Sequence, residues 1–160
     1  MRSVAAIVFS MLACGVASAQ TAKDLVGTWH QAANVTTAQD GTKSDVFGPN
    51  PKGMLIMNQD GYFAVILHRP DVPKVASNNR VQGTPEENKA VVNGSIALYG
   101  SYALDGKTLK LKVEGSTFPN WNGADQTREI IAFKGDEFTW RVKGSTGGTN
   151  ETTFRRVKSQ

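Results

Sequence analysis

The chain has 160 residues, one cysteine and two histidines, and its 18 Lys and Arg residues against 14 Asp and Glu residues give a net charge of +4. This length favours a single domain. One cysteine excludes an intramolecular disulfide framework and a cysteine-rich zinc site, and two histidines, His30 and His68, argue against a histidine-based metal centre. The positive charge is small and dispersed, so the composition predicts no nucleic-acid partner, and no motif indicates a cofactor.

The first nineteen residues have the pattern of a secretory signal peptide. Arg2 provides a positive charge, residues 4–13 form an apolar run, and residues 17–19 read Ala-Ser-Ala. The run is too short to anchor the chain in a bilayer, and no later stretch suits a transmembrane helix. A buried N-terminal helix is the alternative, but the rest of the chain shows no helical period against which it would pack. We therefore expect cleavage after Ala19, a mature domain of residues 20–160, and a secreted or periplasmic location without stable membrane insertion.

Cys14 raises the alternative of a lipoprotein, in which a lipidated cysteine follows a short Leu-Ala-Gly-like sequence. The residues before it are Met11, Leu12 and Ala13, which do not fit that sequence, and the Ala-x-Ala site lies only a few residues further on. We therefore favour a soluble exported protein, from which Cys14 is removed with the signal peptide.

The remainder of the chain reads as a series of short antiparallel strands. Asp-Gly and Asn-Gly pairs recur between apolar segments, and such pairs suit tight turns because glycine accepts a positive φ. Short strands bounded by turns are typical of an all-β sandwich or barrel, and closure into a barrel would remove exposed strand edges. The predicted strands are residues 28–37, 54–58, 62–69, 95–104, 108–114, 128–134, 137–143 and 152–157.

Alternation along the strands predicts which side chains face the interior. Leu109, Leu111 and Val113 share one face of their strand, while charged residues occupy the other face. Residues 62–67 are apolar on both faces, so we expect another part of the chain to cover their outer side. The aromatic residues expected inside are Trp29, Tyr62, Tyr99, Tyr102, Phe133 and Trp140.

Two short helices are predicted. Residues 21–24 have the form of a capping box, and Thr84-Pro85-Glu86-Glu87 places an N-cap threonine, a proline and a third-position glutamate in order. The second helix should run to about Val92 and end at Asn93-Gly94. Residues 70–83 before it have no regular pattern, so we interpret the whole segment between the third and fourth strands as an irregular lid or plug of the barrel.

Gly27-Thr28-Trp29, at the start of the first strand, resembles the G-x-W signature of the lipocalins. The resemblance implies that Trp29 closes one end of the barrel and that a basic residue of the last strand stacks over it. Arg155 and Arg156 are both available, and strand parity with Phe154 favours Arg156. Its guanidinium would form a cation–π contact and shield the indole from water.

Longer stretches are similar to a family of small bacterial lipocalin-like domain proteins. The resemblance covers nearly all of residues 24–157 and implies a single antiparallel barrel of about eight strands, with no settled activity. The mature chain would have none of the cysteines that staple many secreted lipocalins. The similar stretches are residues 47–56, 77–80, 83–89 and 114–122.

An eight-stranded barrel either fills its interior with side chains or holds one small ligand. Because the predicted interior is mostly apolar, we expect a small hydrophobic or amphipathic molecule in the barrel mouth. His68 shares strand parity with Tyr62 and would point into the mouth, or it is a surface or hydrogen-bonded structural histidine. Arg80 in the lid would pair with a ligand carboxylate or hold the lid to the barrel, and Arg128 would pair with Glu114 or Asp125. The candidate ligand-binding residues are His68, Arg80, Tyr99, Tyr102, Glu114, Trp121 and Arg128, and the structural motif comprises Gly27, Trp29 and Arg156.

Two other functions are compatible with the sequence. One is an enzyme, an isomerase, cyclase or hydrolase that uses His68, Tyr99 or Glu114. The chain has no G-x-S-x-G, H-E-x-x-H, Walker A or G-x-G-x-x-G signature, so binding is favoured over catalysis. The other is an interaction module of the cell envelope that uses the loop aromatics Phe118 and Trp121. No oligomeric state is predicted.

Overall fold

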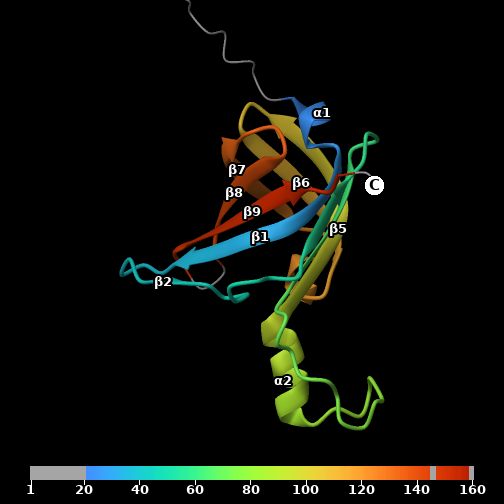
Figure 1. Cartoon of the computed structure of the whole chain (residues 1–160). Coiled ribbons are helices and arrows are strands. Elements are labelled where there is room, and N and C mark those ends of the chain that lie inside the picture. Colours follow the sequence, from blue (N-terminus) through green and yellow to red (C-terminus); the bar gives the residue numbers. More distant parts are fainter. Residues whose placement is uncertain (1–20, 145–146, 159–160) are drawn as a thin grey trace, which may run out of the picture.

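The computed structural model describes residues 21–144 and 147–158. The predicted signal peptide and Cys14 lie outside the described residues. In chain order (Figure 1), the elements are α1 (Ala22–Leu25), β1 (Gly27–Thr37), β2 (Lys43–Ser44), β3 (Met54–Met57), β4 (Tyr62–His68), α2 (Pro85–Gly94), β5 (Ser95–Asp105), β6 (Thr108–Ser116), the 3-10 helix η1 (Pro119–Trp121), β7 (Asp125–Phe133), β8 (Glu137–Lys143) and β9 (Thr149–Arg156).

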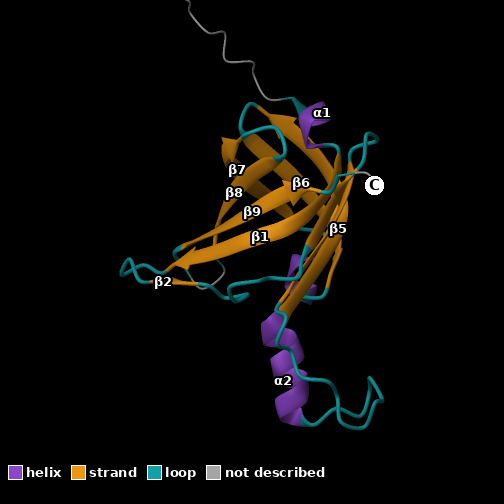
Figure 2. Ribbon diagram, viewed as in Figure 1, coloured by secondary structure: helices purple, strands orange, loops and turns teal. Residues whose placement is uncertain are grey.

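The strands form one closed antiparallel barrel. From β3 to β9 each strand pairs with the next strand in the chain, and β1 pairs with both β3 and β9, which closes the sheet (Figure 1, Figure 2). The two-residue strand β2 only pairs with the end of β1. Extra residues shift the register at Ala32, Glu114 and Ile131, and such bulges bend strands toward closure. The predicted antiparallel barrel is confirmed, with β2 as an addition.

The strand boundaries follow the predictions to within a few residues. β7 begins at Asp125 and β9 begins at Thr149, both earlier than predicted. In each case the extension is polar, and it is held by backbone pairing with a neighbouring strand, as in the pair of Lys112 with Asp125. Because backbone pairing does not require alternating apolar side chains, the sequence pattern did not indicate these strand ends.

Aromatic side chains fill the half of the barrel near α1. Trp29 meets Phe138 edge-on with 4.8 Å between the ring centroids, and Phe138 stacks on Phe154 at 5.3 Å. Trp140 contacts Phe154 edge-on at 4.8 Å. Trp29, Phe138 and Phe154 have no exposed surface, and the inward residues of β6 are buried with them, as alternation predicted.

Two aromatic residues that were expected inside, Tyr62 and Tyr99, lie on the outer face and are 51% and 54% exposed. The inward residues of β4 are Phe63, Val65 and Leu67. The prediction was wrong because residues 62–67 are apolar at both parities, so the pattern did not select a face. The expected cover over this side is also absent from the described residues. The result is an outer apolar face on β3, β4 and β5, formed by Met54, Ile56, Tyr62, Ile66 and Tyr99.

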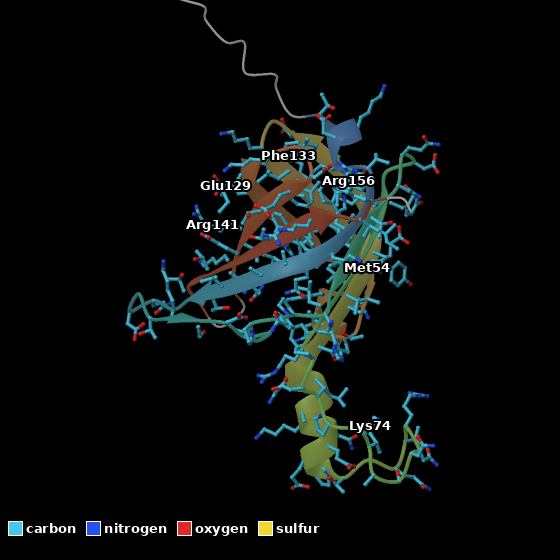
Figure 3. The ribbon with its side chains drawn as sticks, viewed as in Figure 1. Met54, Lys74, Glu129, Phe133, Arg141 and Arg156 are labelled. Atoms are coloured by element: carbon cyan, nitrogen blue, oxygen red, sulfur yellow. The ribbon has the colours of Figure 1, made fainter. Side chains whose placement is uncertain are left out.

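Residues 69–94, which we call the arm, project from the barrel at the end opposite α1 (Figure 1). Figure 3 shows Lys74 in the arm, well separated from the barrel. The expected lid or plug is therefore wrong, although the predicted capping box of Thr84 and Glu87 begins α2. β5 follows α2 without a linking residue, so no turn folds the helix back over the barrel. Neither described α-helix has the length and apolar character needed to cross a membrane.

Arg156 and α1 close one end of the barrel. The Arg156 guanidinium carbon lies 3.9 Å from the centroid of the Trp29 ring, which is the contact implied by the G-x-W resemblance. Its two terminal nitrogens donate to the carbonyls of Asp24 and Val26, both at 2.6 Å, and Figure 3 shows the residue close to α1. The Trp29 indole donates to the Leu25 carbonyl at 2.9 Å. One arginine thus covers the indole and ties the last strand to the first turn of the domain.

Gly27 allows this close approach. Its φ is +137°, and a Cβ at this position would lie 2.6 Å from a terminal nitrogen of Arg156. Only glycine combines that backbone conformation with the missing side chain. The glycine of the G-x-W motif is therefore required by the position of Arg156.

Replacement of Arg156 by Met should lower the free energy of unfolding by about 2–3 kcal/mol, because it removes charge-assisted hydrogen bonds to two carbonyls. Denaturant unfolding followed by tryptophan fluorescence measures the change. The matched control is Arg155→Met, since exposed Arg155 pairs only with Glu137 on the surface and should contribute less than about 1 kcal/mol. Equal losses in the two variants would contradict the closing role of Arg156.

Candidate functional site

Polar side chains line the interior of the barrel beyond the aromatic core. They come from β1, β7 and β9 and share an inward face with core residues such as Ile130 and Phe154. Four of the six are buried, and the other two are half-buried. We call this set the polar interior cluster: Gln31, Asn34, Gln126, Arg128, Asn150 and Thr152.

One part of the cluster is satisfied by its own hydrogen bonds. The Asn34 side-chain nitrogen donates to the Thr152 hydroxyl at 2.9 Å and to the Asn150 side-chain oxygen at 3.0 Å. The Asn150 amide nitrogen donates to the Thr36 hydroxyl at 2.8 Å. These bonds link the side chains of β1 and β9 across the seam that closes the barrel. Because each group has a partner, this part of the cluster has a structural role.

Arg128 is in a different situation. It is 7% exposed, and its guanidinium carbon lies 5.8 Å from the centroid of the Trp140 ring. Its terminal nitrogens donate to the Thr127 carbonyl at 3.0 Å and to the Gln126 side-chain oxygen at 2.6 Å. Both acceptors are uncharged and belong to the same strand. Throughout residues 21–144 and 147–158, no carboxylate forms a salt bridge with Arg128.

Burial without a counter-charge disfavours the charged form of Arg128. Desolvation lowers the pKa of this guanidinium to about 10. That shift corresponds to roughly 3 kcal/mol against the charged form. The predicted pairs with Glu114 and Asp125 are wrong, because both carboxylates are exposed on the outside of the barrel wall while Arg128 faces inward.

Gln31 is the second member of the cluster whose buried polar atoms are not compensated. It is 5% exposed, and neither its amide nitrogen nor its amide oxygen has a hydrogen-bond partner. Its side chain passes over Gly53, where a Cβ would lie 2.8 Å from the Gln31 Cβ. A buried amide without partners destabilises a protein by about 1–3 kcal/mol, and native structures rarely retain one without a reason.

Apolar side chains complete the surroundings of Arg128. Trp140 lies beneath the guanidinium, and Leu109 of β6, which pairs in register with Arg128, is fully buried. Trp121 in η1 packs partly against the core and meets Phe118 edge-on at 5.4 Å. The interior therefore combines one buried cation and one free amide with aromatic and aliphatic walls, which is the composition typical of small-molecule sites.

Most of the other predicted site residues lie elsewhere. His68 shares its face with exposed Tyr62, and Tyr99 and Glu114 are exposed on the outside, so their expected place in the mouth is wrong. The prediction that His68 and Tyr62 lie on the same face of β4 is confirmed, but that face is the outer face of the barrel. Arg80 belongs to the arm and does not cover the barrel (Figure 1).

Tyr102 does face the interior, but it serves the end near α1. Its hydroxyl donates to the Asn58 carbonyl at 2.8 Å, and burial raises its pKa. It therefore holds the turn between β3 and β4. Arg128 is the predicted ligand-binding residue that belongs to the polar interior cluster, and Trp121 packs partly buried against the hydrophobic core.

Sequence reasoning missed the uncharged members of the polar interior cluster. Gln31 is two residues from Trp29, and Thr152 is two residues from Phe154, so parity alone would have placed both inside. Asn34 could not be found in this way, because the bulge at Ala32 changes the parity of β1. The sequence analysis expected apolar and aromatic residues inside the barrel, so these polar residues were not predicted to face the interior.

The two best-formed hollows on the described residues are open to solvent and are not lined by Gln31 or Arg128. One lies on β5, β6 and β7 beside Lys110 and Lys112, and the other lies beside Gln39 and Gly147. Within the described ranges, no group of three His, Cys, Asp or Glu side chains is placed to hold a metal ion. Of the polar interior cluster, Gln126 alone lines one of these two hollows, so the cluster is the strongest candidate site because of its chemistry.

Comparison with known proteins identifies a family match and solved structures with a similar barrel. The model of the lipocalin-like domain family matches residues 26–157, which include every strand. Solved structures with a similar barrel include a lipocalin-like protein from Bacteroides uniformis, at 15% identity and a TM-score of 0.46, over 84% of this chain and 99% of that chain. The redesigned β-barrel mFAP1 bound to DFHBI is similar at 20% identity and a TM-score of 0.42, over 85% and 98% of the two chains. A mutant of the fluorescent protein UnaG is similar at 14% identity and a TM-score of 0.41, over 86% and 99%. No curated protein matches the chain significantly.

Replacement of Arg128 by Met should raise the free energy of unfolding of the ligand-free protein by about 1–3 kcal/mol, because it removes a buried charge that has no counter-charge. Thermal and denaturant unfolding measure the change. Arg141→Met is the control, since Arg141 lies on the outer surface and pairs with Glu151 at 2.8 Å and Glu129 at 3.6 Å (Figure 3). The control should lose up to about 1 kcal/mol. A loss of stability in Arg128→Met larger than in the control would show that Arg128 is structural.

Proposed function

Because the chain belongs to the lipocalin-like domain family, we propose that its barrel binds one small amphipathic molecule against the polar interior cluster. The observation that carries this proposal is the buried, uncompensated Arg128. A protein that only needed a filled core would be more stable with an apolar residue at this position. Destabilising polar groups of this kind are typical of functional sites.

The geometry of the cluster supports binding with local rearrangement. Neither of the two best-formed hollows is lined by Arg128, so the proposed ligand would enter by displacing side chains. Gln31 has no hydrogen bond to break, and Arg128 is held only by groups one and two residues away on β7. These two side chains can therefore turn toward a ligand without the loss of a hydrogen bond between strands.

The same geometry gives less support to catalysis. His68, Tyr99 and Glu114, the acid–base residues of the enzyme hypothesis, are on the outside of the barrel wall. No side-chain hydrogen bond among the described residues joins any two of them. A binding protein requires only the polar and apolar groups that already surround Arg128.

The full chain should bind dansylaminoundecanoic acid with saturation, and directly excited dansyl emission should shift to the blue as the probe enters an apolar site. Val142→Phe enlarges an inward side chain on β8, close to the cluster, and should weaken binding by about tenfold or more through steric exclusion. Ile66→Ser, on the outer apolar face, should leave binding unchanged.

The two variants separate an interior site from a surface site. Loss of binding in Ile66→Ser with normal binding in Val142→Phe would place the probe on the outer apolar face and contradict the proposal. Absence of saturable binding in the unmodified chain would also contradict it.

A further inference from the structure

We propose that the natural ligand of the barrel is a small monoacid, whose carboxylate pairs with Arg128 and whose apolar part lies against Trp140 and β6. This inference rests on the proposed function, since it names the chemical class of the molecule that is bound there. It follows from the charges, the free hydrogen-bond donors and the apolar neighbours of Arg128.

The arginines of the described chain show an unusual distribution of counter-charges. Four arginines with more exposed side chains each have a carboxylate partner, and Arg80, which has none in the described chain, is exposed to water. Arg128 is the buried charged residue of the described chain, and it has no carboxylate partner. Desolvation makes a counter-charge most valuable at the buried position. The paired arginines are Arg69 with Asp71, Arg141 with Glu151, Arg155 with Glu137 and Arg156 with Asp136.

Arg128 also has unused hydrogen-bond donors. A guanidinium has five N–H groups, and the two bonds to Thr127 and Gln126 leave the others without an acceptor in the described chain. A carboxylate accepts two parallel hydrogen bonds from a guanidinium, so it matches this geometry better than a single hydroxyl or carbonyl oxygen does.

The charge inside the barrel matches a single negative charge. Arg128 is the buried cation of the described residues, and the free donor of the cluster, the Gln31 amide, is neutral. A dianion such as a phosphate monoester would bring a second charge into the interior without compensation, at a large desolvation cost. A carboxylate is neutralised completely by one arginine.

The rest of the ligand should be apolar. Gln31 pairs in register with Phe154, whose ring contacts Trp140 at 4.8 Å, and Arg128 lies over Trp140. The free amide and the buried cation are therefore connected by aromatic surface. An aliphatic or aromatic body attached to the carboxylate would lie on this surface and keep the ion pair out of water.

The test compares ligands that differ only in the head group. Decanoate, decan-1-ol and decylamine are titrated into the full chain by isothermal titration calorimetry. Decanoate should bind about tenfold or more tightly than decan-1-ol, because charge-assisted hydrogen bonds are stronger than neutral ones, and decylamine should bind most weakly. Arg128→Met should abolish the advantage of the acid and keep the affinity for the alcohol. Arg128→Lys, which retains the charge without the bidentate geometry, should keep part of the advantage.

Arg141→Met, which removes a surface arginine of the neighbouring strand, should leave the order of the three affinities unchanged. Equal binding of decanoate and decan-1-ol to the unmodified chain would overturn the monoacid and leave the proposed function intact. A preference for decanoate that persists in Arg128→Met would overturn the assignment to Arg128. Absence of binding by all three compounds would overturn both proposals.

Discussion

The pairing of β1 with both β3 and β9 is the constraint on which the rest of the structure depends. It closes the sheet, so every strand of the barrel wall acquires one face that is shielded from water and one that is wet. After closure, parity decides the environment of each side chain, whatever its chemical type. Arg128 shares parity with Ile130 and is therefore buried, together with its charge.

Two arginines each lie over a tryptophan ring in this barrel, but they differ in how their charge is compensated. Arg156 lies 3.9 Å from the Trp29 ring, donates to two carbonyls and has Asp136 at 3.5 Å, so its charge is compensated. Arg128 lies 5.8 Å from the Trp140 ring and has only neutral acceptors on its own strand. The first arrangement stabilises the closed end of the barrel. The second leaves a buried positive charge that a negatively charged ligand can neutralise.

Much of this fold could be predicted from the sequence, because its signals are local. Turn glycines and alternation located the strands, the Thr84 capping box located α2, and the parity of Phe154 selected Arg156. Two failures were of a different kind. Residues 62–67 are apolar at both parities, so only the closed barrel decides that Phe63 faces inward and Tyr62 outward. The direction of the arm depends on how α2 joins β5, which no sequence pattern reports.

The candidate site was only partly predictable, because it depends on tertiary features that no local sequence pattern reports. Arg128 was identified, but its partners were sought among carboxylates close in sequence, and these lie outside the barrel wall. The bulge at Ala32 brings Asn34 to the inner face and cannot be read from residue types. The site is a product of closure and bulges, which are tertiary features, whereas the closed end is built largely from a contiguous motif.

The most direct test of the account observes the Arg128 guanidinium itself. Nitrogen-15 NMR of the arginine side chains, recorded while decanoate is added, follows each Nε–H separately. We predict that the Arg128 resonance moves with saturation, while the resonance of Arg141, paired with Glu151 on the outer surface, stays in place. An Arg128 resonance that does not change while decanoate binds would contradict the claim that this buried charge is the binding site.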